Sequence, residues 1–170
     1  MGTLRRATPA DAADLTRLRG LMLQAMGTPA LPQSWREACE GAFRRRLLAG
    51  DFVAFGVEEE GRLVSCGAGW IEEHLPTAGQ YDGRRGQVAS MSTEPEWRRR
   101  GYARDVFGAL LDWFAELDVP RIDLRATPDG RPLYESFGFQ VLGNASMVWT
   151  APGADVPLAG AADGSGPRLR

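Results

Sequence analysis

The strongest constraint on the fold is a strand pattern, a helix pattern and a second strand pattern that follow one another. Residues 103–117 carry apolar side chains at helical spacing and form the clearest helix of the chain. The runs 87–93 before it and 121–126 after it are typical of strands. Strands joined through a helix are normally parallel neighbours, because a parallel connection must cross the sheet. The sequence therefore predicts a parallel strand pair with an amphipathic helix packed on it.

The other patterns complete one α/β or α+β domain with a mixed sheet over residues 1–150. Thr8 is expected to cap a first helix and Ser34 a second helix that runs through Leu48. The remaining expected elements are an extended start at 4–7, a hairpin of 52–57 and 63–71, a short helix at 131–137, and a closing antiparallel pair at 139–142 and 147–150 around Gly143-Asn144. Residues 151–170 have little to bury and are expected to form a poorly ordered tail.

Composition excludes several classes of function. The 20 cations are all arginine and face 22 carboxylates, so the net charge of -2 argues against a nucleic-acid binder. The lack of lysine excludes Schiff-base and P-loop chemistry. His74 is the single histidine, and no metal-binding motif is present. Cys39 and Cys66 are expected to be small buried residues. No apolar run is long enough to span a membrane and no signal peptide is evident, so the sequence favours the cytoplasm.

The segment 93–104 carries the chemistry, because it joins a strand to the start of the strongest helix. The helix start offers unpaired N–H groups and a positive dipole end, which together suit a diphosphate. Gly101 and Ala103 leave that backbone accessible to an approaching phosphate. Charge-assisted donors come from Arg98, Arg99, Arg100 and Arg104. Taken alone, the arginine triplet could equally be a solvated charge run in front of a helix.

Two motifs resemble those of the GNAT superfamily of N-acetyltransferases. Arg98-x-x-Gly101-x-Ala103 is similar to the acyl-CoA pyrophosphate motif of that family. The segment 133–139, Leu-Tyr-Glu-Ser-Phe-Gly-Phe, is similar to its Leu-Tyr-x-x-x-Gly-Phe motif. The resemblance covers about residues 4–150. It implies a single domain with a mixed, mostly antiparallel sheet, a central parallel pair splayed around the cofactor, and helices on both faces.

The resemblance also implies acetyl-CoA as the acyl donor. Its pantetheine arm would pair with the strand 87–93, and its pyrophosphate would lie on the N–H groups from Arg99 to Arg104. Thr127 stands where the family often has an asparagine, and its hydroxyl can still donate to the pantetheine. Tyr134 would return a proton to the departing thiolate. The cofactor residues implied are Met91, Thr93, Arg98, Arg99, Arg100, Gly101, Tyr102, Ala103, Arg104 and Thr127.

The general base is left open among carboxylates near the end of the strand 63–71. Glu72 and Glu73 are the first choices, because that strand should approach the acceptor, while His74 and Glu94 are alternatives. Alternation places Glu72 and His74 on one face and Glu73 on the other. The acceptor pocket is expected between the segments 22–33 and 74–85.

The function predicted from these observations is transfer of an acetyl group from acetyl-CoA to a primary amine of a small molecule or peptide. The alternative is a non-catalytic acyl-CoA-binding or regulatory domain of the same fold. No nucleic acid, membrane or metal partner is expected. A homodimer formed through the closing strands is the expected assembly.

Overall fold

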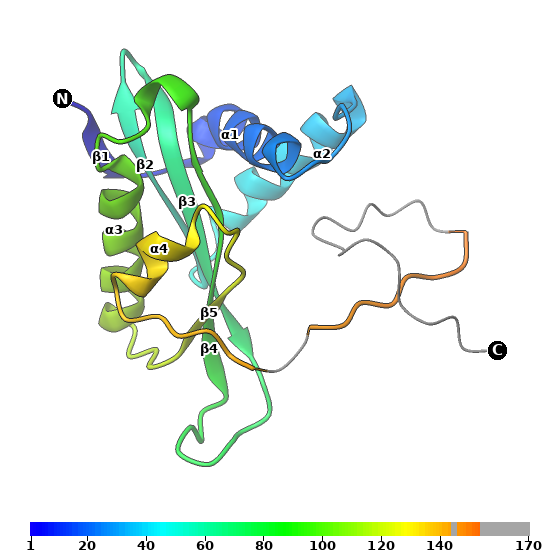
Figure 1. Ribbon diagram of the computed structural model, residues 1–170, viewed down its shortest axis with the longest axis vertical. Helices are drawn as coiled ribbons and strands as arrows, with labels where there is room; N and C mark the ends of the chain where they lie inside the picture. The colour runs from blue at the N-terminus through cyan, green and yellow to red at the C-terminus, as the bar shows by residue number, and fades with distance from the viewer. Residues whose placement is uncertain (144–145, 154–170) are drawn as a thin grey trace.

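The computed structural model describes residues 1–143 and 146–153 and contains one five-stranded sheet in the order β1-β2-β3-β4-β5 (Figure 1). Strands β1 to β4 pair antiparallel, and β5 lies parallel to β4. The strands are β1 (Thr3–Arg6), β2 (Phe52–Glu59), β3 (Arg62–Glu73), β4 (Arg84–Thr93) and β5 (Ile122–Leu124). The helices are α1 (Ala12–Ala25), α2 (Gln33–Arg46), α3 (Tyr102–Glu116) and α4 (Arg131–Glu135), with short 3-10 turns η1 (Pro9–Asp11) and η2 (Pro95–Trp97). The predicted single α+β domain with a mixed sheet is confirmed.

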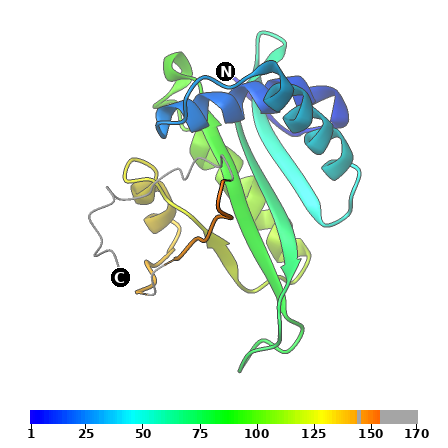
Figure 2. The same cartoon turned by 90° about the vertical axis from the view of Figure 1, so that its right-hand side faces the viewer.

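The parallel pair is short and then opens. Its register runs only from Gly86 beside Ile122 to Val88 beside Leu124. Strand β4 continues to Thr93, whereas β5 has ended, as the long green and short yellow-green strands of Figure 2 show. Within the described residues, the backbone of β4 beyond Val88 therefore has no strand beside it on the β5 side. This opening is the predicted splay of the parallel pair.

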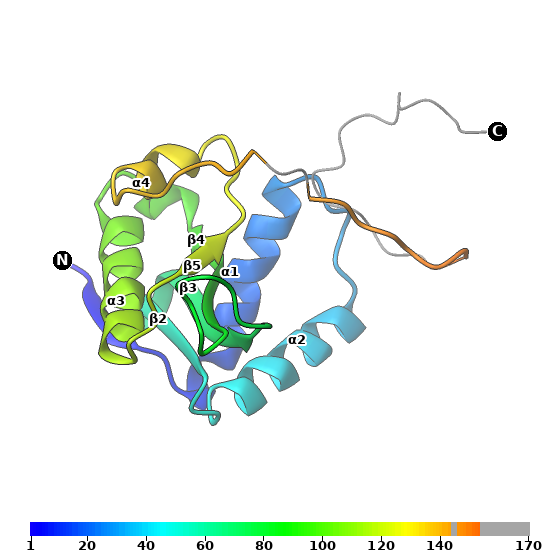
Figure 3. The ribbon, with the colours of Figure 1, turned by 90° about the horizontal axis from the view of Figure 1, so that it is seen from below.

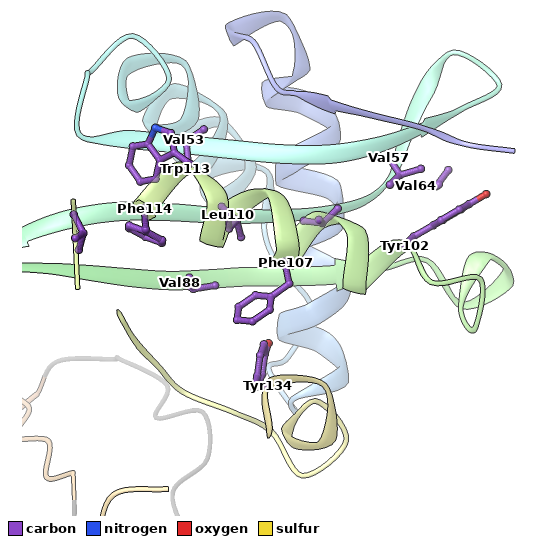
Figure 4. Close-up of a cluster of buried hydrophobic side chains, with 12 residues drawn as sticks. Val53, Val57, Val64, Val88, Tyr102, Phe107, Leu110, Trp113, Phe114 and Tyr134 are labelled. Carbon is purple, nitrogen blue, oxygen red and sulfur yellow. The ribbon is translucent and has the colours of Figure 1, made fainter. Parts of the chain in front are cut away.

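The helices cover both faces of the sheet. Figure 3 shows α3 and α4 on one side of the strands, and α1 and α2 on the other. Each side has its own buried cluster. The α3 side is filled by the aromatic and aliphatic residues of Figure 4, among them Phe107, Leu110 and Phe114, each fully buried. The α1 side packs Leu15 and Leu18 against smaller residues of β2 and β3.

Three predictions about local structure are corrected. Residues 139–142 and 146–150 form no strand in the part of the chain that the structure describes, and Asn144 lies outside it. Their apolar pattern marks strand propensity, but a strand exists only where a partner strand pairs with it. Pro32, not Ser34, stands at the cap of α2, because Ser34 already lies in the first turn. That helix also ends at Arg46, before the predicted Leu48.

The predicted tail begins at Ala151, and residues 154–170 lie outside the described part of the chain. Among the described residues, no helix combines the length and the apolar character needed to cross a bilayer.

Candidate active site

The loop between β4 and α3 has the backbone of an anion site. Arg99 and Gly101 adopt left-handed conformations, with φ of 61° and 86°, and turn the chain twice within three residues. The Gly101 carbonyl accepts the first helical hydrogen bonds, from the N–H groups of Arg104 and Asp105. The N–H groups of Tyr102 and Ala103 precede these and have no partner within the helix. They lie at the positive end of a 15-residue helix, where a phosphate is favoured.

The space around the Cβ position of Gly101 is open. A Cβ built at this position would meet no atom within 4 Å. The left-handed φ excludes most other residues, and the lack of a side chain leaves the neighbouring N–H groups uncovered. Both features fit the predicted role of Gly101.

The four arginines of the motif are exposed, and three of them have local partners. Arg98 donates from Nε to the Thr93 carbonyl at 3.1 Å. The Arg100 guanidinium lies over the Trp97 ring, 4.5 Å from its centroid. Arg104 lies over Phe137 and donates to Ser136 at 3.0 Å, which ties α3 to α4. These contacts hold the guanidinium groups around the loop and leave several of their N–H donors facing solvent.

Tyr102 anchors the loop and does not face a ligand with its side chain. Its ring is buried and stacks on Trp97, with centroids 6.4 Å apart. Its hydroxyl donates to Glu59 and accepts the N–H of Gly2 at 3.2 Å. Only the backbone N–H of Tyr102 is therefore available for the predicted cofactor contact.

Met91 and Thr93 lie on the open stretch of β4, where the backbone beyond Val88 is free toward β5. The Met91 side chain packs over Gly67, where a Cβ would come within 2.3 Å of its Sδ. The Thr93 hydroxyl is hydrogen-bonded to that of Ser65 at 2.8 Å. Both side chains thus fix the strand. The backbone groups of Met91 and Thr93 are what these residues can offer to an extended ligand.

Tyr134 projects from α4 toward α3 beside the opening (Figure 4). Its ring packs edge-on against Phe107 at 5.0 Å and is 9 % exposed. It lines a pocket of about 420 Å³ together with Leu124 and Ala126 of the β5 side. Burial raises the pKa of the Tyr134 phenol, so it is protonated at neutral pH and can donate. This placement fits a general acid.

Thr127 is partly committed to the turn that leads into α4. Its Oγ1 accepts the N–H of Gly130 at 3.2 Å, and its carbonyl accepts the N–H groups of Gly130 and Arg131. The hydroxyl proton is still free to donate, and the side chain is exposed. The predicted contact with a pantetheine needs only that proton.

Glu72 and Glu73 end β3, beside the start of β4, whereas the loop follows the other end of β4. In the sheet they stand beside Arg85 and Arg84, three or more residues before Val88, which is about 10 Å along the strand. Glu72 accepts from Trp70 Nε1 at 2.9 Å and lies 3.2 Å from His74 Nε2. Glu73 lines a separate pocket of about 440 Å³. The structure does not bring either carboxylate together with Tyr134.

Glu94 is held as a structural anion. It is 4 % exposed and forms ion pairs with Arg17 and Arg62. Burial opposes its ionisation, but the hydrogen bonds and charges of the two arginines outweigh it and lower the pKa of the carboxyl. A carboxylate so engaged is poorly suited to accept a proton, and its contacts fix the start of the loop.

Sequence reasoning missed one contact at the opening. Arg19 of α1 donates from Nη1 to the Ser90 hydroxyl of β4 at 2.5 Å. Ser90 is buried and has a left-handed φ of 56°, next to a register shift between β3 and β4. The only sequence signal is the position of Arg19 four residues after Leu15, on the stripe of α1 that faces the sheet.

The Cys66 thiol is not a candidate nucleophile. Burial raises the pKa of the Cys66 thiol to about 12, so it is not a thiolate at neutral pH. Within residues 1–143 and 146–153, no group of three or more histidine, cysteine, aspartate or glutamate side chains could hold a metal ion.

A splayed parallel pair, an anion loop at a helix start and a buried tyrosine beside the opening are the features that the resemblance to the N-acetyltransferases predicts. The model of the acetyltransferase (GNAT) family matches residues 21–139. The chain belongs to this family, as the motifs Arg98-x-x-Gly101-x-Ala103 and 133–139 predict.

Individual relatives agree with this assignment. A predicted acetyltransferase from Clostridium acetobutylicum, whose crystal structure was determined with acetyl-CoA, is 26% identical with a TM-score of 0.79 over 87% of this chain and 96% of its own. A GCN5-related N-acetyltransferase from Ralstonia eutropha shares the fold, at 22% identity and a TM-score of 0.77 over 88% of this chain and 99% of its own. A mycothiol acetyltransferase from Acidimicrobium ferrooxidans is 32% identical over 101 residues, which are 57% of this chain. The match spans only about a third, 31%, of that relative's length.

Proposed function

We propose that the protein transfers the acetyl group of acetyl-CoA to a primary amine of a small molecule or peptide. The observation that carries the proposal is the anion loop around Gly101, which lies directly after the unpaired stretch of β4. A diphosphate on the N–H groups of Tyr102 and Ala103 would leave the attached chain beside that stretch. The Clostridium relative, determined with acetyl-CoA, supports this choice of donor.

The transfer proceeds by direct attack. The amine nitrogen forms a bond to the thioester carbonyl carbon, the carbon–sulfur bond breaks, and the thiolate leaves. Tyr134 gives its phenolic proton to that thiolate and regains one from solvent. The buried ring and raised pKa of Tyr134 support this role, because the donor must be protonated before the step. The un-ionised thiol of Cys66 argues against an acetyl-cysteine intermediate.

The acceptor amine must lose a proton during the transfer. Glu72 and Glu73 are the carboxylates that the sequence favours for this role, but they lie about 10 Å or more before the opening. We therefore propose that water carries the proton away, and that these carboxylates act only on an acceptor long enough to reach them.

The proposal is tested in two stages on the same protein. Acetyl-CoA at 100 times its dissociation constant should stabilise the fold by about 2.7 kcal/mol, measured as a shift in thermal unfolding. Release of CoA in the presence of a panel of primary amines should then identify acceptors. Stabilisation without release by any amine would favour a non-catalytic acyl-CoA-binding domain. No stabilisation at saturating acetyl-CoA would overturn the donor assignment.

We also propose that the protein works in the cytoplasm. Its two cysteines, Cys39 and Cys66, are both free, which suits a reducing compartment.

A homodimer stays our proposal for the assembly, although residues 139–142 and 146–150 form no strand in the described part of the chain. Among residues 1–143 and 146–153, β4 is the only strand beside β5, and Trp149, in the segment that follows, is 81 % exposed. Exposed apolar side chains and an unpaired strand edge both favour pairing with a second copy.

Sedimentation is expected to give twice the 18.5 kDa mass of the chain. Trp149→Ser should weaken the dimer, whereas Tyr81→Ser, at a side chain 82 % exposed in another loop, should not. A single 18.5 kDa species at high concentration would contradict this proposal.

A further inference from the structure

Arg19 places a positive charge at the opening of the parallel pair. Its Nη1 lies 2.5 Å from the Ser90 hydroxyl, and Ser90 stands two residues beyond Val88, where the pairing of β4 with β5 ends. Arg19 reaches this point from α1, on the opposite side of the sheet from α3 and Tyr134 (Figures 3 and 4). A molecule entering on the α1 side would meet the Arg19 guanidinium next to the strand that holds the donor.

Arg19 forms no ion pair with the residues that the structure describes. Within the described part of the chain, no carboxylate oxygen lies within 4.0 Å of its guanidinium. Arg17, half a turn earlier on the same helix, contrasts with it, because Arg17 pairs with both Asp14 and Glu94. The Ser90 hydroxyl uses one of the five N–H donors of Arg19 and fixes the group, which leaves a planar fork free.

A partly buried, oriented guanidinium without a counter-ion is suited to a negatively charged ligand group. Carboxylates and phosphates can accept two parallel hydrogen bonds from one arginine, which gives both affinity and orientation. A cationic group at the same place would be repelled, so the residue also selects against acceptors that are positively charged near the amine.

We infer that Arg19 is a specificity residue that binds a carboxylate or phosphate of the acceptor close to its reactive amine. The inference rests on the proposed function, in which the acceptor attacks a donor bound in the opening. It narrows the acceptor from any primary amine to one with an anionic group, such as an amino acid, a short peptide whose terminal carboxylate lies near the amine, or an amine phosphate.

The test compares pairs of amines in which only one member carries the anionic group, with each rate referred to the unprotonated fraction of the amine. Suitable pairs are glycine with glycinamide, β-alanine with β-alaninamide, and phosphoethanolamine with ethanolamine. Two readouts are used: the rate of CoA release from acetyl-CoA, and thermal stabilisation of the CoA-bound protein by each amine. We expect the wild type to prefer the anionic member of at least one pair, and the pair that responds separates carboxylate from phosphate recognition.

Variants of Arg19 connect that preference to the residue. Arg19→Gln should lower kcat/KM for the anionic member by roughly 10- to 100-fold, mainly through KM, and change the neutral member less than about threefold. Arg19→Lys keeps the charge without the fork and should fall between the two. Arg36→Gln removes an exposed arginine of α2 and is the matched control, with no change expected. Acetyl-CoA stabilisation should be the same in all four proteins.

Several outcomes would overturn the inference. One is a wild type that prefers the neutral member in every pair, or that shows no preference by either readout. Another is an Arg19→Gln protein whose kcat/KM falls equally for both members of a pair. The wild-type comparison decides the matter even if the variants fold poorly. Failure of the proposed function gives a different result. The protein would then bind CoA, but no amine would cause it to form free CoA from acetyl-CoA. The stabilisation readout would still report on Arg19.

Discussion

Gly101→Val is expected to abolish the stabilisation of the protein by acetyl-CoA while the fold survives. Valine at a φ of 86° is strained, and its branched side chain would occupy space that is open beside the start of α3. A diphosphate could then no longer approach the N–H groups of Tyr102 and Ala103. The measurement is the shift in thermal unfolding at an acetyl-CoA concentration that stabilises the wild type by about 2.7 kcal/mol.

The chain offers a matched control for this variant. Gly79, in the loop between β3 and β4, has a φ of 82° and equally open space around its Cβ position. Gly79→Val therefore carries the same backbone strain far from the anion loop. It should lower the unfolding temperature as much as Gly101→Val does but retain the full acetyl-CoA shift. Equal acetyl-CoA shifts in the two variants would show that the loop does not bind the donor.

Tyr134→Phe is expected to lower turnover by roughly 10²- to 10⁴-fold, the usual contribution of a positioned acid. The change removes one oxygen and keeps the ring that packs on Phe107, so stability and acetyl-CoA affinity should stay close to those of the wild type. Turnover on a good acceptor and the acetyl-CoA dissociation constant are the two measurements. Arg36→Gln, which alters an exposed arginine of α2 outside the predicted acceptor pocket, is the control and should change neither.

The pH profile gives a second readout of Tyr134. Because burial raises the pKa of the phenol above its usual value near 10, the acid is present throughout the neutral range and is lost only in strong alkali. The wild type should therefore show no loss of this group between pH 6 and about 9, and the rate deficit of Tyr134→Phe should be constant there. A Phe variant with wild-type turnover, where chemistry limits the rate, would assign the proton to solvent.

Much of the fold could be predicted because its signals are local. The helix predicted at 103–117 is observed as Tyr102–Glu116, since the apolar stripe and the glycine before it belong to one short segment. The hairpin of β2 and β3 follows from two apolar runs around Glu60-Gly61, both of which adopt positive φ. The predicted closing pair is wrong because strand propensity at 139–142 and 147–150 does not show which partner strand is available.

The site residues also differ in whether a local sequence signal marks them. Residues 98–103 and Tyr134 stand in motifs, so sequence alone could place the loop and the tyrosine. Contacts between distant segments had no such signal. The sequence allows Glu94 as a possible base, but the structure buries it between Arg17 and Arg62, which are 77 and 32 residues away in the chain. The contact of Arg19 with Ser90 spans 71 residues and depends on how α1 crosses β4.

The position of α1 and α2 across the sheet from α3 has a consequence for engineering. The groups proposed to hold the donor and return the proton all come from residues 84–135, whereas the helices on the other face come from residues 12–46. The hydrophobic clusters on the two faces of the sheet are separate, so side chains on one face can be exchanged without repacking the other face. A library restricted to α1, α2 and the turn between them, with Arg17 kept because it pairs with Glu94 at the start of the loop, would test the proposed acceptor choice on a constant donor half. The protein is in this sense a two-part scaffold, with Arg19 as the first position to diversify.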